Sequence, residues 1–77
     1  MNITIELSGA LKRKFKENKF EFAVAEGHTI KQIILDLGYK EEEMRYLIPV
    51  LNNKRVDMLS KVEEGDHLRI LLPLGGG

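Results

Sequence analysis

The C-terminal segment is the part of the sequence best suited to chemistry. Residues 72–77 read LPLGGG and finish on three glycines, Gly75, Gly76 and Gly77. A terminal α-carboxylate has a pKa of about 3.3–3.7 and is therefore ionised at neutral pH. The carboxylate of Gly77 could attack the α-phosphate of ATP, and a sulfur nucleophile could then open the resulting acyl-adenylate. We take Gly77 as the candidate reactive residue and Gly75 and Gly76 as side-chain-free residues that could thread a narrow channel. The alternative is that the glycines are a frayed terminus or an engineered addition.

Three apolar residues lead to this segment. Pro73 lacks a backbone N–H and so ends any strand before it, which would let the glycines project from the fold. Leu71 is expected on the outward face of the last strand. Together with Pro73 and Leu74, it is a candidate for binding a partner protein. The alternative for Leu71 is partial burial, because single exposed leucines are common and usually carry no function.

Other chemical signals are weak. His28 and His67 have no ligand-like spacing around them, so we expect solvated histidines and no metal site. The acidic run 41–43 suits the start of a helix, although a basic patch on a partner could also use it. The basic cluster within 12–16 lacks the aromatic residues that would indicate nucleic-acid binding. With no cysteine in the sequence, disulfides, thiolate metal sites and cysteine nucleophiles are excluded.

The bulk composition is that of one small domain. The chain has 77 residues, of which 43% are hydrophobic and 31% charged, and its 12 acidic and 12 basic side chains balance. This balance gives no field that would attract nucleic acid or an anionic membrane. No apolar run approaches the roughly 20 residues that span a bilayer, and the N-terminus does not resemble a signal peptide. Since a small secreted domain usually needs disulfides, we expect the protein in the cytoplasm.

The first half of the chain predicts two strands and a helix. Residues 3–7 and 20–24 alternate apolar and polar side chains with a period of two, which indicates two half-buried strands joined as a hairpin. Thr29 and Gln32 fit a capping box. Apolar residues follow at helical spacing: Ile30, Ile33, Ile34 and Leu37. We expect a helix from Thr29 to Leu37, closed by Gly38.

The second half predicts short strands. A turn or short helix is expected at 41–47 and a strand at 48–51, in which Pro49 favours an edge position. Asn52-Asn53 suits a tight hairpin turn before a return strand at 54–56. After a turn at Gly65-Asp66, the last strand is expected at 67–72. This order predicts an α+β fold, a mixed sheet with one main helix across one face, formed by a domain at 1–72 with a flexible tail at 73–77.

The sequence resembles the ubiquitin-like sulfur carriers, the family of the small subunit of molybdopterin synthase and of the thiamine-pathway carrier (MoaD and ThiS type). The likeness covers nearly the whole chain. It runs through the opening strand 3–7, the helix start at 27–30, the hairpin at 50–53, Gly65-Asp66 and the final Gly76-Gly77. Leu72 and Leu74 beside Pro73, and the third glycine Gly75, depart from the usual family pattern.

The resemblance implies a β-grasp fold and a sulfur-transfer cycle. A partner activating enzyme, using ATP and magnesium, would adenylate Gly77, and a sulfur donor would convert it to a thiocarboxylate. In the molybdopterin case, the tail would then enter a sulfur-accepting synthase subunit. The chain itself would be a carrier with no bound cofactor, and not an enzyme. Three alternatives stay open. They are a carrier for thiamine thiazole or tRNA thiolation, a protein modifier joined to lysines through Gly77, and a plain binding module.

Overall fold

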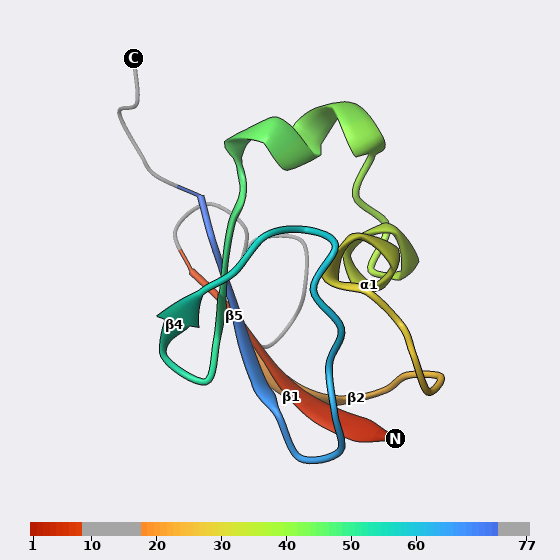
Figure 1. The fold of residues 1–77 in the computed structure, drawn as a ribbon. Helices are drawn as coiled ribbons and strands as arrows, with labels where there is room; N and C mark the ends of the chain where they lie inside the picture. Colours follow the sequence, from red (N-terminus) through yellow and green to blue (C-terminus); the bar gives the residue numbers. More distant parts are fainter. Residues whose placement is uncertain (9–17, 73–77) are drawn as a thin grey trace.

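The computed structural model describes residues 1–8 and 18–72. They form a mixed five-stranded sheet with one α-helix and one 3-10 helix (Figure 1). In chain order the elements are β1 (Asn2–Leu7), β2 (Lys19–Ala23), α1 (Ile30–Asp36), the 3-10 helix η2 (Glu41–Tyr46), β3 (Ile48–Leu51), β4 (Lys54–Arg55) and β5 (His67–Leu71).

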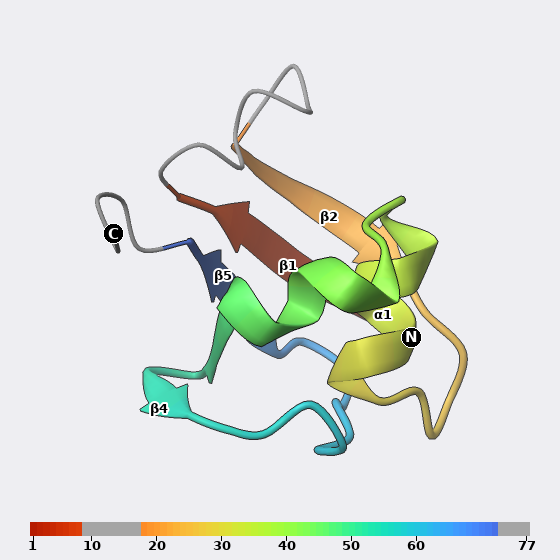
Figure 2. The ribbon, with the colours of Figure 1, turned by 90° about the horizontal axis from the view of Figure 1, so that it is seen from above.

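The first and last strands meet in the middle of the sheet. The strand order is β2-β1-β5-β3-β4. β1 pairs antiparallel with β2 and parallel with β5, and β3 pairs antiparallel with both β5 and β4. Parallel neighbours require a crossover connection, and the chain between β1 and β5 contains α1, which lies against one side of the sheet (Figure 2). The predicted α+β architecture is confirmed.

The capping of α1 agrees with the sequence prediction. The Thr29 Oγ1 accepts from the backbone N–H of Gln32, and the Gln32 side chain accepts from the backbone N–H of Thr29. At the other end, Leu37 is the C-cap residue, and Gly38 follows it with a φ of 101°. That left-handed conformation is cheapest for a residue without a Cβ. Local chemistry therefore sets both ends of the helix.

The core lies between α1 and the inner face of the sheet. Ile33 and Ile34 are 0% exposed, as predicted from the apolar stripe. Alternate residues of the central strands point inward to meet them, because successive side chains of a strand lie on opposite faces. These inward residues are Ile3, Ile5 and Leu7 from β1, and Leu68 and Ile70 from β5.

Two turns use the residues that the sequence indicated. Asn52 and Asn53 have φ values of 50° and 69°, which is the backbone of a two-residue turn with both central residues left-handed. Gly65 has a φ of 83° and leads into β5. The return strand is shorter than predicted, because β4 ends at Arg55 and Val56 lies outside it.

The expected edge position of Pro49 is wrong. β3 lies between β5 and β4, and the two-residue β4 is the edge strand. The carbonyl of Pro49 accepts from the Val56 N–H at 3.2 Å. Since the N–H and C=O of one strand residue point to the same side, the donor that proline lacks faces the chain leaving β4. The ladder between β3 and β5 therefore loses nothing.

Some sequence predictions concern residues outside the described ranges. The basic cluster within 12–16 is among them. So is segment 73–77, so the proposed boundary between domain and tail stays a prediction. Within the described ranges, no helix has the length and apolar composition that crossing a membrane requires.

Candidate functional site

The sheet face opposite α1 carries the side chains that could meet a partner. Directly paired residues of neighbouring strands project to the same face, so the register defines this surface. We call it the open face. Its members are Asn2, Thr4 and Glu6 of β1, Lys19, Glu21 and Ala23 of β2, Ile48 and Val50 of β3, Arg55 of β4, and His67, Arg69 and Leu71 of β5. Asn2, Arg55 and the three residues of β2 are exposed, and the others are half-buried.

One end of the open face is apolar. Leu71 pairs with Ile48, and the neighbouring pair joins Arg69 to Val50. We call Ile48, Val50 and Leu71 the apolar patch. Leu71 thus projects outward, as predicted, and is also half-buried. Because β5 ends at Leu71, the patch lies at the end of the strand that precedes the C-terminal segment.

The other end of the open face is polar. The Nε2 of His67 lies 2.9 Å from the Oε1 of Glu6, and the hydroxyl of Thr4 donates to Glu21 at 2.6 Å. These contacts join neighbouring strands across the face. Local sequence patterns could not indicate the contact of His67 with Glu6, because it depends on the parallel register that sets Thr4 opposite His67. The contact of Thr4 with Glu21 follows from the antiparallel register of β1 and β2.

Both histidines, which were expected to be solvated, are partly exposed and also contact a carboxylate. His67 contacts Glu6, and the Nε2 of His28 lies 2.9 Å from a carboxylate oxygen of Asp36 at the far end of α1. Each histidine is matched with a single carboxylate. In residues 1–8 and 18–72, no group of three or more potential metal-ligating side chains is found.

The acidic run forms the start of η2, as expected, and connects η2 to α1 through an ion pair. The Lys31 ammonium donates to Glu41 at 2.9 Å. This hydrogen bond is the main cause of a lowered pKa at the Glu41 carboxyl, and the positive charge of Lys31 lowers that pKa further. Glu43 accepts from the backbone N–H of Lys40 at 2.7 Å. Two of the three glutamates, Glu41 and Glu43, thus accept hydrogen bonds from other residues of the chain.

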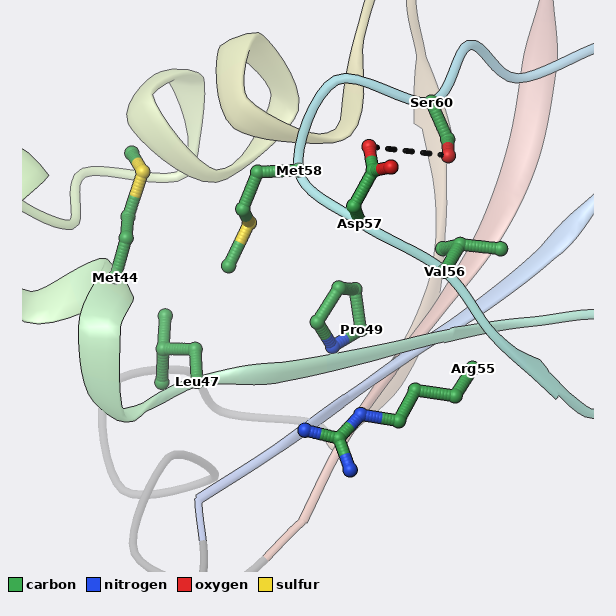
Figure 3. A pocket seen from close by; sticks show the side chains of 8 residues that line it. All are labelled: Met44, Leu47, Pro49, Arg55, Val56, Asp57, Met58 and Ser60. Carbon is green, nitrogen blue, oxygen red and sulfur yellow. Dashed lines mark hydrogen bonds between the residues drawn. The ribbon is translucent and has the colours of Figure 1, made fainter.

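A groove that the sequence did not predict lies beside η2. Its volume is about 560 Å³, and it is bordered by η2, the start of β3 and the chain from β4 onward (Figure 3). It is lined by Met44, Leu47, Pro49, Arg55, Val56, Asp57, Met58 and Ser60. Five of these side chains are apolar. No sequence signal could have found the groove, because its walls come from segments that only the fold brings together.

The predicted reactive end lies outside the described residues. Leu72, the last described residue, packs against the core. Pro73, Leu74, Gly75, Gly76 and Gly77 follow it. Of the predicted site residues, the structure therefore places only Leu71. The roles assigned to all six residues, Leu71 included, stay predictions.

Comparison with known proteins gives matches at the level of structure alone. No family model matches the sequence, and no curated protein matches it. Among solved structures, SAMP1 (small archaeal modifier protein 1) from Haloferax volcanii has a TM-score of 0.80 at 14% identity, with 100% of each chain covered.

Two further structures carry names from molybdopterin synthesis. The putative molybdopterin converting factor subunit 1 from Pyrococcus furiosus has a TM-score of 0.77 at 12% identity, covering 95% of this chain and 98% of that one. A chain from the complex of subunits 1 and 2 of the molybdopterin-converting factor from Helicobacter pylori has a TM-score of 0.65 at 22% identity, with 100% of each chain covered. At these identities the likeness establishes the fold: the chain has the ubiquitin-like β-grasp fold that its sequence resemblance implied.

Proposed function

We propose that this protein is a sulfur carrier that acts through the carboxylate of Gly77. The observation that carries the proposal is that the glycines follow closely in the sequence after the end of a central strand. β5 lies in the middle of a β-grasp sheet and ends at Leu71, and the triglycine begins four residues later. A reactive group there would stand beside the apolar patch, within reach of any protein bound to it.

The chemistry needs only the terminal carboxylate from this chain. One carboxylate oxygen attacks the α-phosphate of ATP and pyrophosphate leaves, giving the acyl-adenylate. A hydrosulfide then attacks the carbonyl carbon and AMP leaves, so that one oxygen of Gly77 is replaced by sulfur. The activating partner would supply ATP, magnesium and catalysis. This chain would supply a substrate without side chains near the attacked carbon.

Molybdopterin synthesis is the most direct use for such a thiocarboxylate. Structural likeness to the P. furiosus and H. pylori proteins supports it, and the latter is found in a complex of subunits 1 and 2. By analogy, this chain would be the small non-catalytic subunit of a synthase. Its tail would enter a second subunit, which accepts the sulfur into the dithiolene of the cofactor.

The open face would dock both partners. The apolar patch offers three aliphatic side chains flanked by Arg69, and Leu71 leads into Pro73 and Leu74. Docking there would cover half-buried apolar surface and aim the segment that follows at the active site of the partner. Both the activating enzyme and the synthase subunit would have to receive the C-terminal segment in their active sites. The two would therefore bind the open face one after the other.

Protein modification is the second candidate, because SAMP1 matches the full length of the chain at a TM-score of 0.80. The same acyl-adenylate, or a thioester formed from it, would then be attacked by a lysine amine of another protein. The product is an isopeptide bond at Gly77 instead of a thiocarboxylate. Both candidates use the same activated end and differ in the nucleophile.

The test is mass spectrometry of the protein purified from its own host, together with a strain that lacks it. A Gly77 thiocarboxylate and a loss of molybdopterin in the deletion strain would support the leading proposal. A thiocarboxylate with normal molybdopterin would assign the sulfur to thiamine thiazole or tRNA. Gly77 adducts on the lysines of other proteins would select the modifier. A native chain that continues past Gly77 without being cleaved would contradict both candidates.

A further inference from the structure

The turn beside the groove holds an unusually exposed leucine. Leu59 is 73% exposed, more than Tyr46 and Leu35, the other exposed large hydrophobic residues among those that the structure describes. The turn itself is closed by hydrogen bonds. Asp57 Oδ1 accepts from the Leu59 N–H at 2.8 Å, and the Asp57 carbonyl accepts from the Ser60 N–H at 3.2 Å. Leu59 therefore stands in a defined turn, although it has almost no contact with the core.

Contacts with α1 fix this turn further. The carbonyls of Met58 and Ser60 accept from the Lys31 and Ile30 N–H groups, both at 2.9 Å. These are amides of the first helical turn, which have no partner within the helix. The turn thus completes the N-terminus of α1, and moving it would leave those amides without acceptors. Leu59 is held out between two residues, Met58 and Ser60, that line the groove.

The side chains that line the groove favour two kinds of group in an occupant. Its walls include Met44, Leu47 and Met58 (Figure 3), so an aliphatic side chain would fit between them. Arg55 borders the same space, and it has no ion pair with any residue that the structure describes. A matching partner would therefore present an aliphatic side chain and a carboxylate close together.

The chain presents this pair of groups itself, at the edge of the groove. Asp57 and Leu59 are exposed and two residues apart. The Asp57 Oδ1 is bound within the turn, and a carboxylate has a second oxygen that can accept from a guanidinium. The groove and its own edge are therefore complementary in polarity and charge.

We propose that the groove binds a second copy of this chain in a symmetric dimer. Leu59 of each copy enters the groove of the other, and Asp57 of each faces Arg55 of the other. A two-fold axis makes every such contact occur twice. The equal numbers of acidic and basic residues, 12 each, mean that two copies do not repel one another at long range. A contact this small is transient, as is typical of interfaces well below the standard size.

This dimer does not depend on the chemistry at Gly77. Its experiment measures association of the unmodified protein, with sedimentation equilibrium and ¹⁵N- and methyl-NMR spectra recorded from micromolar to millimolar concentration. The expected result is reversible dimerisation, with concentration-dependent shifts at Leu59 and at the methyl groups of Met44 and Met58. The resonances of Ile48 and Leu71, which lie two residues along the strands from the pair of Val50 and Arg55, should stay constant.

Two variants and a matched control sharpen the experiment. Leu59→Asp places a charge where the aliphatic side chain enters, and Arg55→Glu sets two acidic groups opposite each other. Each should raise the dimer dissociation constant by about tenfold or more, or abolish dimerisation. Leu35→Asp changes the exposed leucine of α1 and should leave the constant unchanged. Both altered residues, Leu59 and Arg55, are exposed, so melting temperatures should show that the fold is kept.

Three results would overturn the proposal. The first is a protein that stays monomeric at millimolar concentration. The second is association whose shifts fall on Ile48 and Leu71 and spare Met44 and Met58, because the copies would then meet through the open face away from the groove. The third is a dimer that Leu59→Asp and Arg55→Glu leave as stable as the wild type, because another surface would then hold it.

Discussion

Ile48 and Leu71 lie directly opposite each other across the antiparallel pair of β3 and β5. The pairing places the first residue of β3, just after η2, beside the last residue of β5. Gly77 follows Leu71 by six residues, and an extended chain spans at most about 3.3–3.6 Å per residue. An enzyme that binds the apolar patch must therefore hold its ATP within about 20 Å of Leu71.

Replacing Leu71 tests the docking role of the apolar patch. In Leu71→Asp, the carboxylate would have to lose its water on docking without gaining a partner, which is costly. We expect the dissociation constant for the activating enzyme to rise by about tenfold or more, as measured by calorimetry with the purified pair. Leu35→Asp, on the other side of the molecule, is the control and should bind normally. Normal binding by a stably folded Leu71→Asp would remove Leu71 from the docking surface.

Shortening a core residue of α1 tests the packing. Ile34 is 0% exposed, so Ile34→Ala should reduce the free energy of unfolding by about 2–5 kcal/mol through lost burial and a new cavity. Leu35→Ala is the neighbouring control. Leu35 is 40% exposed, so this change should alter the stability by about 0.5 kcal/mol or less. Urea denaturation of both variants measures the difference. Equal losses would mean that the helix buries a different face.

The Lys31–Glu41 ion pair predicts a specific pH response. Its hydrogen bond and positive charge lower the pKa of Glu41 in the folded state. A lowered pKa adds stability above the unfolded pKa, and this stability is lost as the pH falls through the folded value. The contribution is small, because the pair is exposed. Lys31→Met should raise the Glu41 pKa in a carbonyl ¹³C NMR titration, whereas Lys54→Met should not. An unchanged midpoint in Lys31→Met would show that the pair does not form in solution.

Features set by neighbouring residues could be predicted from the sequence. The capping box of Thr29 and Gln32, the left-handed Asn52 and Asn53, and the alternation in β1 all depend on residues a few positions apart. Their physical cause lies within the segment itself, so pattern reasoning located them correctly.

Features set by strand order could not be predicted in this way. Pro49 was expected on an edge strand, but the short β4 covers β3. The contact of His67 with Glu6 exists only because β1 and β5 pair in parallel. The groove likewise gathers Met44 and Met58 from separate segments. In each case the partner is distant in sequence, and no local propensity identifies it.

The central claim concerns Gly77 and predicts a defined chemical change. Incubation with the cognate activating enzyme, ATP, magnesium and sulfide should replace one oxygen by sulfur on the C-terminal peptide alone. Deleting Gly77 should abolish this change. Gly76→Trp should also abolish it, because a large side chain would block a narrow channel next to the attacked carbonyl. Both variants should melt at the wild-type temperature, since the core residues lie within 3–70.

Mass spectrometry of that reaction is the most direct measurement. The carrier account predicts an ATP-dependent thiocarboxylate on wild-type protein and none on the Gly77 deletion. A wild-type mass that the activating enzyme leaves unaltered would contradict the account. Equal modification of the Gly77 deletion would contradict it as well.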